Sequence, residues 1–448
     1  LFDAAQALVS RRQLQDATDA AALAAANVIP SGTPRGCSAT AGPPPGIPRD
    51  VVASAARASL TANVGATLSA AAIITCPNAW NNGGVRVDLS TTTTSFFARI
   101  LGRTGFDVST RATAVNTLAP GHPYSVITLN PYNPSWQNSL KGCPSFLFNG
   151  SPTITSYGSI HIDSACPAGQ GYALSRSGVS STVTMLNGSF VEVVGAADPG
   201  AMTIIPAPIQ GAQYLPDPLA GLAPPNVAAL PVRRTTRLIL NNASATLDPG
   251  VYQGGLELRN RSQAYLHPGI YVFQGGGVDL GAQAELYTIG QAFTSATQAN
   301  WATQCPNDGS CGVLMYNMAS GGTMGQFHTT AGTVFLVRGY QFGYSGPGFN
   351  NDFKGILLWQ ARDPAPTSTY VQPEVQLQGG ASVSISGTIY AASAPVQLAG
   401  GSGGGGGFDI DYHLQFICWD IKFSGTSDWR LQYNDLYFYQ APDYGLVE

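Results

Sequence analysis

The segment ATLDPGVY (residues 245–252) is followed 19 residues later by the closely similar segment AYLHPGIY (264–271). Each copy leads through adjacent glycines into a short alternating stretch, QGGLEL (253–258) and QGGGVDL (274–280), and weaker relatives follow within 377–401. Self-similarity at about 20 residues, with short strands and glycine corners, is typical of a solenoid. Each coil then buries its apolar faces only against the next coil. We therefore expect a right-handed parallel β-helix, with a β-sandwich as the alternative because the repeat is irregular.

The composition of the whole chain agrees with a β-rich protein that turns often. The chain has 448 residues, of which 53 are Gly and 31 are Pro, the two poorest helix formers. A mostly helical protein is therefore excluded. The hydrophobic share of 44% is ordinary for a globular protein, which excludes global disorder.

Charge and cysteine content narrow the class of protein further. Only 10% of the residues are charged, the net charge is −4, and no basic run is longer than Arg11-Arg12 or Arg233-Arg234, which argues against nucleic-acid binding. The sequence contains no stretch of 18 apolar residues that would predict a membrane span. Seven Cys and few Lys favour an exported protein over a cytosolic one. Leu1 in place of Met predicts processing or an omitted upstream segment.

Residues 1–28 predict a long amphipathic helix with a small-residue face. The segment contains no Gly or Pro and is rich in Ala, Leu and Gln. One face collects apolar residues at steps of three, four and seven, and charged residues point away from it. The apolar face comprises Ala7, Leu14, Ala17, Ala21, Ala25 and Val28, and the charged residues are Arg12, Asp16 and Asp19.

The rest of residues 1–118 completes a small α+β unit. A second helix is expected at about 50–72, with Asp50 as its N-cap. Residues 84–90 and 106–115 alternate as strands, and Thr92–Leu101 is expected to form a short helix between them.

The solenoid domain is expected to occupy residues 119–448, after a boundary marked by LAPGHP (118–123). A Pro-rich insertion (206–231) interrupts it, with too many prolines for regular structure, and is expected to wrap the surface or cap an element. The run GGSGGGGG (400–407) predicts a loop. The aromatic segment 429–444 is expected to cap the end of the solenoid or to dock on a neighbouring subunit.

The segment RRQLQDATDAAALAAA (11–26) resembles the hallmark of TadE/TadG-like proteins of tight-adherence (Flp) pilus systems. In that family such a helix directly follows a single membrane-spanning helix. Thr18 is a small departure from the family pattern. Phe96-Phe97 before Leu-Gly and the motif RATA (111–114) agree with it, and the later coils with GTIY (387–390) resemble the solenoid half of its long members.

The resemblance implies a structural subunit of an extracellular pilus-like filament, or a pilus-associated surface protein, that self-assembles and has no catalytic activity. Its partners would be copies of itself or other pilus components, with surface glycans as possible ligands, and it needs no cofactor. The family's membrane helix is missing here, since Leu1–Val9 matches at most its last turns, which favours a cleaved, secreted form. Two alternatives stay open: a carbohydrate-binding or carbohydrate-cleaving β-helix, and a membrane-anchored assembly factor whose anchor is trimmed.

The sequence offers few residues for catalysis or metal binding. β-Helix polysaccharide lyases and hydrolases need clustered carboxylates, whereas the acids here are scattered. The closest approximations are an alternating acid pair, a strand His-Asp pair with both side chains outward, and a Gly-x-Ser-x-Gly match with no following helix. These are Asp409 with Asp411, His161 with Asp163, Ser402, and the repeat acids Glu257, Asp279 and Glu285; His122, His267, His328 and His413 show no metal-ligand spacing.

The cysteines predict three local disulfides and one buried thiol. Cys305 and Cys311 enclose the turn-forming PNDGS, and the other two pairs each flank a compact stretch of chain. Asn-x-Ser sequons occur in polar turns and matter only in a host that glycosylates them. The remaining pairs are Cys143 with Cys166 and Cys37 with Cys76; Cys418 is left over, and the sequons begin at Asn149, Asn187, Asn242 and Asn260.

Overall fold

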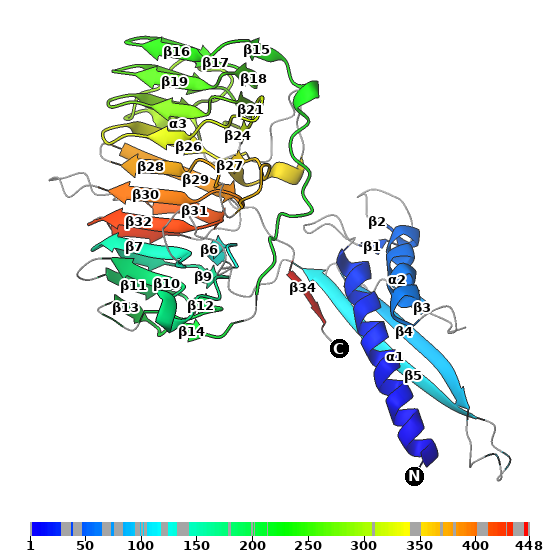
Figure 1. The fold of residues 1–448 in the computed structure, drawn as a ribbon. Helices are drawn as coiled ribbons and strands as arrows, with labels where there is room; N and C mark the ends of the chain where they lie inside the picture. Colours follow the sequence, from blue (N-terminus) through cyan, green and yellow to red (C-terminus); the bar gives the residue numbers. More distant parts are fainter. Residues whose placement is uncertain are drawn as a thin grey trace. The chain divides into compact units, whose positions relative to one another are not determined.

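The computed structural model (Figure 1) divides the chain into two compact units, Leu1–Pro120 with Gln440–Glu448, and Gly121–Tyr439. The residues that it describes are 2–27, 37–38, 47–64, 73–75, 84–94, 99, 102, 105–117, 124–131, 143–177, 181–198, 200, 202–212, 214–306, 310–340, 351–367, 371–379, 382–400, 411–426, 428–432 and 443–446. None of the helices among them has both the length and the apolar character needed to span a membrane.

The first unit combines helices with an antiparallel sheet. Two helices, α1 (Phe2–Asn27) and α2 (Arg49–Val64), pack with the sheet around one hydrophobic cluster. The sheet has the order β3 (Ile73–Thr75), β4 (Gly84–Thr94), β5 (Gly105–Thr117) and β34 (Asp443–Leu446), and β1 (Cys37–Ser38) pairs separately with β2 (Ile47–Pro48).

Helix α1 buries the small-residue face that its sequence predicts. Leu14, Ala17, Ala21 and Ala25 are all buried on this face. The small alanine side chains let the helix lie close to the sheet. Thr18 is buried on the same face, and its hydroxyl lies 2.6 Å from that of Thr110 on β5. The polar Thr18 is therefore paired rather than exposed.

Two local expectations for the first unit differ from the structure. Strand β4 continues through Thr94, so the helix expected at Thr92–Leu101 is wrong at its start; its remaining residues lie almost wholly outside the described ones. The run Thr91–Thr94 is β-branched and pairs with β5, which favours strand over helix. Helix α2 begins at Arg49, so Asp50 lies in its first turn instead of at the N-cap, and residues 65–72 are outside the description.

The solenoid domain was expected to run to Glu448, but Gln440–Glu448 belongs to the first unit. The reason is strand β34, which pairs antiparallel with β5 from Asp443 opposite Thr117 to Leu446 opposite Ala114. A strand pairing of this kind carries little sequence signature, because its hydrogen bonds are made by the backbone.

The second unit is built from parallel strands in three series, which we call the parallel stack (Figure 1). Series one comprises β15 (Val232–Arg234), β18 (Gly250–Gln253), β21 (Gly269–Gln274), β24 (Val313–Met318), β27 (Ile356–Gln360), the second half of β29 (Ser382–Ala391), the second half of β31 (Asp411–Cys418), β6 (Tyr124–Thr128), β9 (Ser159–Ile162), β12 (Val191–Val193) and β14 (Ile209–Gln210).

Series two comprises β16 (Leu238–Asn241), β19 (Leu256–Arg259), β22 (Val278–Leu280), β25 (Phe327–Thr329), β28 (Val375–Gly379), β30 (Val396–Gly400), β32 (Ile421–Gly425), β7 (Phe146–Gly150) and β10 (Leu174–Ser177). Series three comprises β17 (Ser244–Leu247), β20 (Gln263–Leu266), β23 (Glu285–Thr288), β26 (Val334–Arg338), the first half of β29, the start of β31, β33 (Asp428–Leu431), β8 (Thr153–Ser156), β11 (Ser181–Met185) and β13 (Met202–Ile205). A short helix, α3 (Trp301–Gln304), lies in a loop beside series three.

The repeated Pro-Gly-x-Tyr motif forms the corner between series three and series one. Gly250 and Gly269 adopt positive φ angles of 149° and 139°, which glycine tolerates best. The tyrosine that follows each glycine turns back and donates its hydroxyl to the preceding turn: Tyr252 to Asp248 O, and Tyr271 to His267 O, both at 2.8 Å. Stacked tyrosines on neighbouring strands then fill the interior beside each corner.

The order of the strands along the stack differs from their order in the sequence. The last strands of the unit, β31, β32 and β33, pair in parallel with the first, β6, β7 and β8. We call this contact the internal junction. From β6–β8 the chain continues to one end of the stack at β13 and β14, and β15–β17 then start again at the opposite end (Figure 1).

Aromatic side chains fill the internal junction, and one of them is Trp429, the first residue of the segment 429–444 that the sequence predicts as a cap or docking segment. Phe146 stacks on Phe423 with ring centroids 5.4 Å apart, and Trp429 lies edge-on to Phe423 at 5.6 Å. Trp429 is 2% exposed and sits between β31 and β8, inside the stack instead of capping its end. Residues 433–442 lie outside the described part.

The Pro-rich insertion runs along the outside of series one and connects the two ends of the stack (Figure 1). We call its residues 214–231 the strap. Leu219 and Leu230 of the strap are buried in a cluster with side chains of series one, such as Ile270 and Tyr390. The prediction that this segment follows the surface is consistent with its course, and its apolar contacts hold it there.

Candidate functional site

A buried hydrogen-bond network lies on series one beneath the strap. His161 Nε2 lies 2.9 Å from Asp163 Oδ1, and His161 Nδ1 lies 3.1 Å from Glu192 Oε2. Tyr124 donates its hydroxyl hydrogen to the same Glu192 oxygen at 3.0 Å, and the backbone N–H of Leu215 donates to Asp163 at 2.8 Å. The network therefore joins β6, β9 and β12 to the strap.

The position of His161 fits an anchor for the strap better than a catalytic base. Burial opposes a charge on the ring, but the hydrogen bonds and charges of Asp163 and Glu192 outweigh burial and raise the pKa of His161. Two carboxylates facing the ring nitrogens favour the protonated form of His161, whereas a general base has to be neutral and reach its substrate. His161 is only 2% exposed.

The expectation that His161 and Asp163 point outward is therefore right about the strand face and wrong about exposure. Both side chains lie on the face opposite the core residues Ile160 and Ile162, but the strap covers them. Sequence reasoning did not identify Tyr124 or Glu192 as partners. Their only sequence signal is the coil length, which sets each of them one strand away from His161 in series one.

A ladder of charged side chains lies on the outer face of series two. Glu257 on β19 is in register with Asp279 on β22, which is in register with His328 on β25. Arg237 reaches Glu257 at 3.0 Å and Asp279 at 3.9 Å, and His328 Nδ1 lies 3.1 Å from Asp279. The sheet thus brings two of the three repeat acids together. Glu285 lies apart from them, on series three, where it accepts a hydrogen bond from Tyr287.

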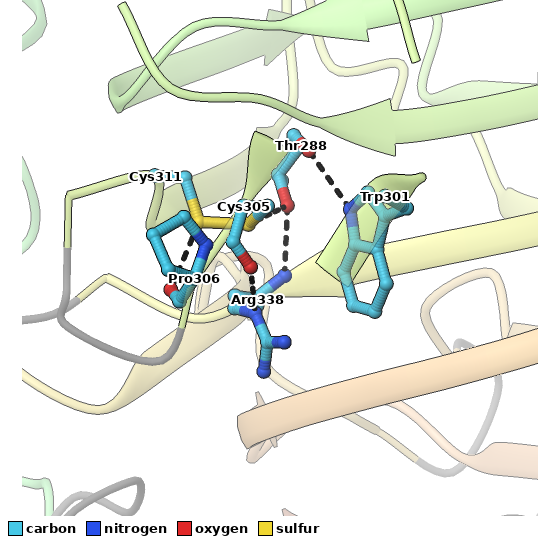
Figure 2. The surroundings of a disulfide bond; sticks show 6 residues. All are labelled: Thr288, Trp301, Cys305, Pro306, Cys311 and Arg338. Atoms are coloured by element: carbon cyan, nitrogen blue, oxygen red, sulfur yellow. Dashed lines mark hydrogen bonds between the residues drawn. A yellow bond between two sulfur atoms is a disulfide. The ribbon is translucent and has the colours of Figure 1, made fainter. Parts of the chain in front are cut away.

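Two disulfides are formed in the second unit, Cys143–Cys166 and Cys305–Cys311. Figure 2 shows the second of them. The Cys305 carbonyl accepts a hydrogen bond from Arg338 Nε at 2.9 Å, and the Arg338 guanidinium lies 4.6 Å from the centre of the Trp301 ring. Trp301 donates to Thr288 O at 2.9 Å, so the loop that carries the Cys305–Cys311 disulfide is attached to series three (Figure 2). Its partners are consistent with a structural role.

The other residues that the sequence singled out divide between exposed, buried and undescribed positions. Cys418 is free and buried in β31. The part of the chain that the structure describes contains no group of three or more His, Cys, Asp and Glu side chains that could hold a metal ion. The sequon residues Asn149, Asn187, Asn242 and Asn260 are exposed, and Asp411 is in register with Arg430. Four of the predicted residues lie outside the described part of the chain: Cys76, His122, Ser402 and Asp409. The predicted Cys37–Cys76 and Asp409–Asp411 pairs are therefore not described.

The two ends of the parallel stack carry exposed apolar side chains on unpaired strands. Among the described residues, β15, β16 and β17 pair on one side only, and so do β13 and β14 at the opposite end. Val232 and Ile239 at the first end are 55% and 46% exposed, and Ile205 and Ile209 at the other end are 55% and 50% exposed. Unpaired parallel strands with apolar side chains are sites where another chain can add.

No protein-family model matches this chain, and comparisons with curated proteins and with solved structures find no match either.

Proposed function

We propose that this protein is a structural subunit of an extracellular, pilus-like filament, or a surface protein associated with one, and that it has no catalytic role. Its second unit would be a right-handed parallel β-helix, and its first unit the α+β part of a TadE/TadG-like protein, the family that residues 11–26 resemble. The parallel pairing throughout the stack supports a β-helix over a β-sandwich, whose strands pair antiparallel.

The observation that carries this proposal is the exposure of apolar residues on the terminal strands at both ends of the stack. A monomeric solenoid ends in strands with polar outer faces that keep it soluble. Here Ile239 and Ile205 occupy such strands instead, and the low content of charged residues, 10%, leaves little repulsion between copies. Two disulfides suit a protein that works outside the cell.

Electron microscopy of material sheared from the cell surface tests the proposal, with mass spectrometry to identify this chain. We expect ordered filaments in which this chain is a main component. Cells that lack the gene, or that express it without residues 1–28, serve as controls and should lose those filaments or the chain's attachment to them. Absence of the chain from all filaments in the sheared material would contradict the proposal and favour an anchored assembly factor.

A second candidate function, carbohydrate binding, is favoured by the polar ladder on series two. Beyond His328 the same position is occupied by Gln376, Gln397 and Lys422 on successive strands. Evenly spaced amide and charged groups about 4.8 Å apart can hydrogen-bond along a linear glycan. Retardation of the chain in gels containing acidic or neutral polysaccharide, lost in a Gln376→Ala, Gln397→Ala variant, would support it; unchanged migration in every polysaccharide would exclude it.

A further inference from the structure

We propose that copies of this chain stack head to tail, with the β15–β17 end of one parallel stack seated on the β13–β14 end of the next. The inference rests on the proposed function and names the contact by which the subunits would join. The occupant of each exposed end is then a second copy of the same chain, and series one continues from one copy into the next.

The strands of series one can continue directly from one copy to the next. Series one begins at β15 and finishes at β14, series two begins at β16 and finishes at β10 with Ala197 bridged to Leu174, and series three begins at β17 and finishes at β13. Since every strand within a series runs in the same direction, β15 of one copy would extend β14 of the next as another parallel neighbour. The free backbone groups of β14 and β15 would be satisfied by the same ladder pattern that joins strands within the chain.

Apolar and charged side chains at the two ends favour contact between unlike ends. Val232 on β15 would lie beside Ile209 on β14, both on series one, while Ile239 and Ile205 lie on the end strands of series two and three; all four are about half exposed in the single chain. The first end, residues 232–241, carries Arg233, Arg234 and Arg237 and no acidic residue, whereas at the other end Asp198 lies 3.9 Å from Arg176 of β10, so their charges offset. Like charges on the three arginines disfavour contact between two copies of the first end, so the first end is better placed against the other end.

The chain already contains one contact of this kind, the internal junction. There, the strands β31–β33 seat on β6–β8 in parallel register, although these strands lie at opposite ends of the unit's sequence. Backbone hydrogen bonds and buried rings such as Phe146 on Phe423 make this contact without a turn connecting the two rungs. A contact between two molecules would repeat that backbone geometry between β14 and β15.

Because the two ends are different surfaces, the contact is heterologous and does not close on itself. A heterologous contact along the stack axis generates an open filament, in which each copy adds its own rungs at a spacing of about 4.8 Å. This supplies a filament from one interface in a single type of subunit.

The test uses full-length chains with lysine placed at one end only. One variant carries Val232→Lys and Ile239→Lys, the other Ile205→Lys and Ile209→Lys; all four positions are exposed, so folding should be retained, which circular dichroism and thermal unfolding check. Sedimentation velocity should show wild-type assemblies that grow with concentration. Each variant alone should associate at least ~10-fold more weakly, because burying an unpaired charge disfavours the contact. Phe293→Lys, at a position 37% exposed beside the stack, is the control and should assemble like wild type.

Mixing the two variants gives the deciding result. Each variant keeps one intact end, so a 1:1 mixture should form a heterodimer and nothing longer. The contact is wrong if either variant alone assembles like wild type, if the mixture stays monomeric while wild type assembles, or if wild type stays monomeric at high concentration. Filaments on cells that express a variant with a blocked end would overturn this contact while leaving the proposed filament function intact.

Discussion

Asp420 is a buried acid whose burial the sequence does not predict. Its side chain is completely buried at the internal junction, where Oδ1 accepts a hydrogen bond from Asn130 Nδ2 at 2.8 Å and Oδ2 has no partner. Burial raises the pKa of Asp420 to about 8, against the opposing effect of the Asn130 hydrogen bond. The carboxyl is therefore protonated at neutral pH, and the uncharged form suits its apolar surroundings.

We predict that Asp420→Asn stabilises the protein at pH 8. The folded pKa lies above the ordinary value of 3.8, so the stability contributed by the protonated group is fully present below pH 4 and declines as the pH rises to about 8. Asparagine keeps the hydrogen bond from Asn130 and cannot ionise. In urea unfolding, the free energy of unfolding of the wild type should fall by ~2–4 kcal/mol more than that of the variant between pH 5 and pH 8.

The matched control for this prediction is Asp16→Asn, because Asp16 is exposed on α1. That variant should show the same pH dependence as wild type. Equal pH dependence in wild type and Asp420→Asn would mean that Asp420 is ionised in the folded protein, and that its environment is more polar than its burial indicates.

At the scale of elements, the strap shows how a Pro-rich segment can be held without regular structure. Arg362, on the outside of series one, donates hydrogen bonds to the carbonyls of Leu219 and Leu222 and to the hydroxyl of Tyr390. Tyr390 in turn donates to Asp217 of the strap at 2.6 Å. Prolines suit such a segment because they lack an N–H to satisfy and restrict the unfolded chain.

We predict that Arg362→Ala loosens the strap while the parallel stack stays folded. The substitution removes charge-assisted hydrogen bonds to two carbonyls. The free energy needed to detach the strap from the stack should therefore fall by ~2–4 kcal/mol. Thermolysin, which cleaves before apolar residues, should then cut within residues 214–231 at least ~10-fold faster than in wild type. Arg261→Ala is the control, since Arg261 is exposed and its Nε bonds Gln283 at 3.3 Å. Equal cleavage rates in the two variants would show that Arg362 does not hold the strap.

At the scale of the whole molecule, the second unit has a strand order that is permuted relative to its sequence. Residues 124–210 form one end of the stack and residues 232–431 form the rest, and they meet at the internal junction. The covalent link between the two parts is the strap, which spans the stack instead of crossing the junction. Packing at the junction, including Phe423 and Trp429, has to hold the two parts in register.

We predict that the two fragments remain associated after the chain is cut just before the strap. A protease site placed between Gly211 and Ala212 allows specific cleavage, and shortening the chain after Tyr439 removes the separate β34–β5 pairing. The two fragments should still elute together from a gel-filtration column, because the internal junction survives the cut. Adding Phe423→Ala, which costs ~3–5 kcal/mol of core packing, should let them separate on dilution. Separation with Phe423 intact would contradict the importance assigned to the junction.

The sequence alone predicted those features that depend on local chemistry. The Pro-Gly-x-Tyr and Gly-Gly repeats mark corners because they need positive φ angles, as at Gly250, and close backbone approach, as at Gly255, where a Cβ would lie 2.1 Å from Gly277 O. The buried face of α1 is also predictable from local sequence, because helical spacing places Leu14, Ala21 and Ala25 on one side. An α+β region followed by a mainly β region is the result, and the structure confirms it at that level.

Only the tertiary structure decided which strands meet and which side chains the strap covers. Backbone ladders in parallel sheets look alike at every rung, so nothing in the residues of β32 specifies β7 as its neighbour or places Trp429 inside the stack. His161 and Asp163 alternate as outward residues on their strand, and they become buried only because Leu215 arrives from a distant part of the chain. Local patterns fix turns and faces; long-range packing fixes order and exposure, because it depends on which surfaces are left to be covered.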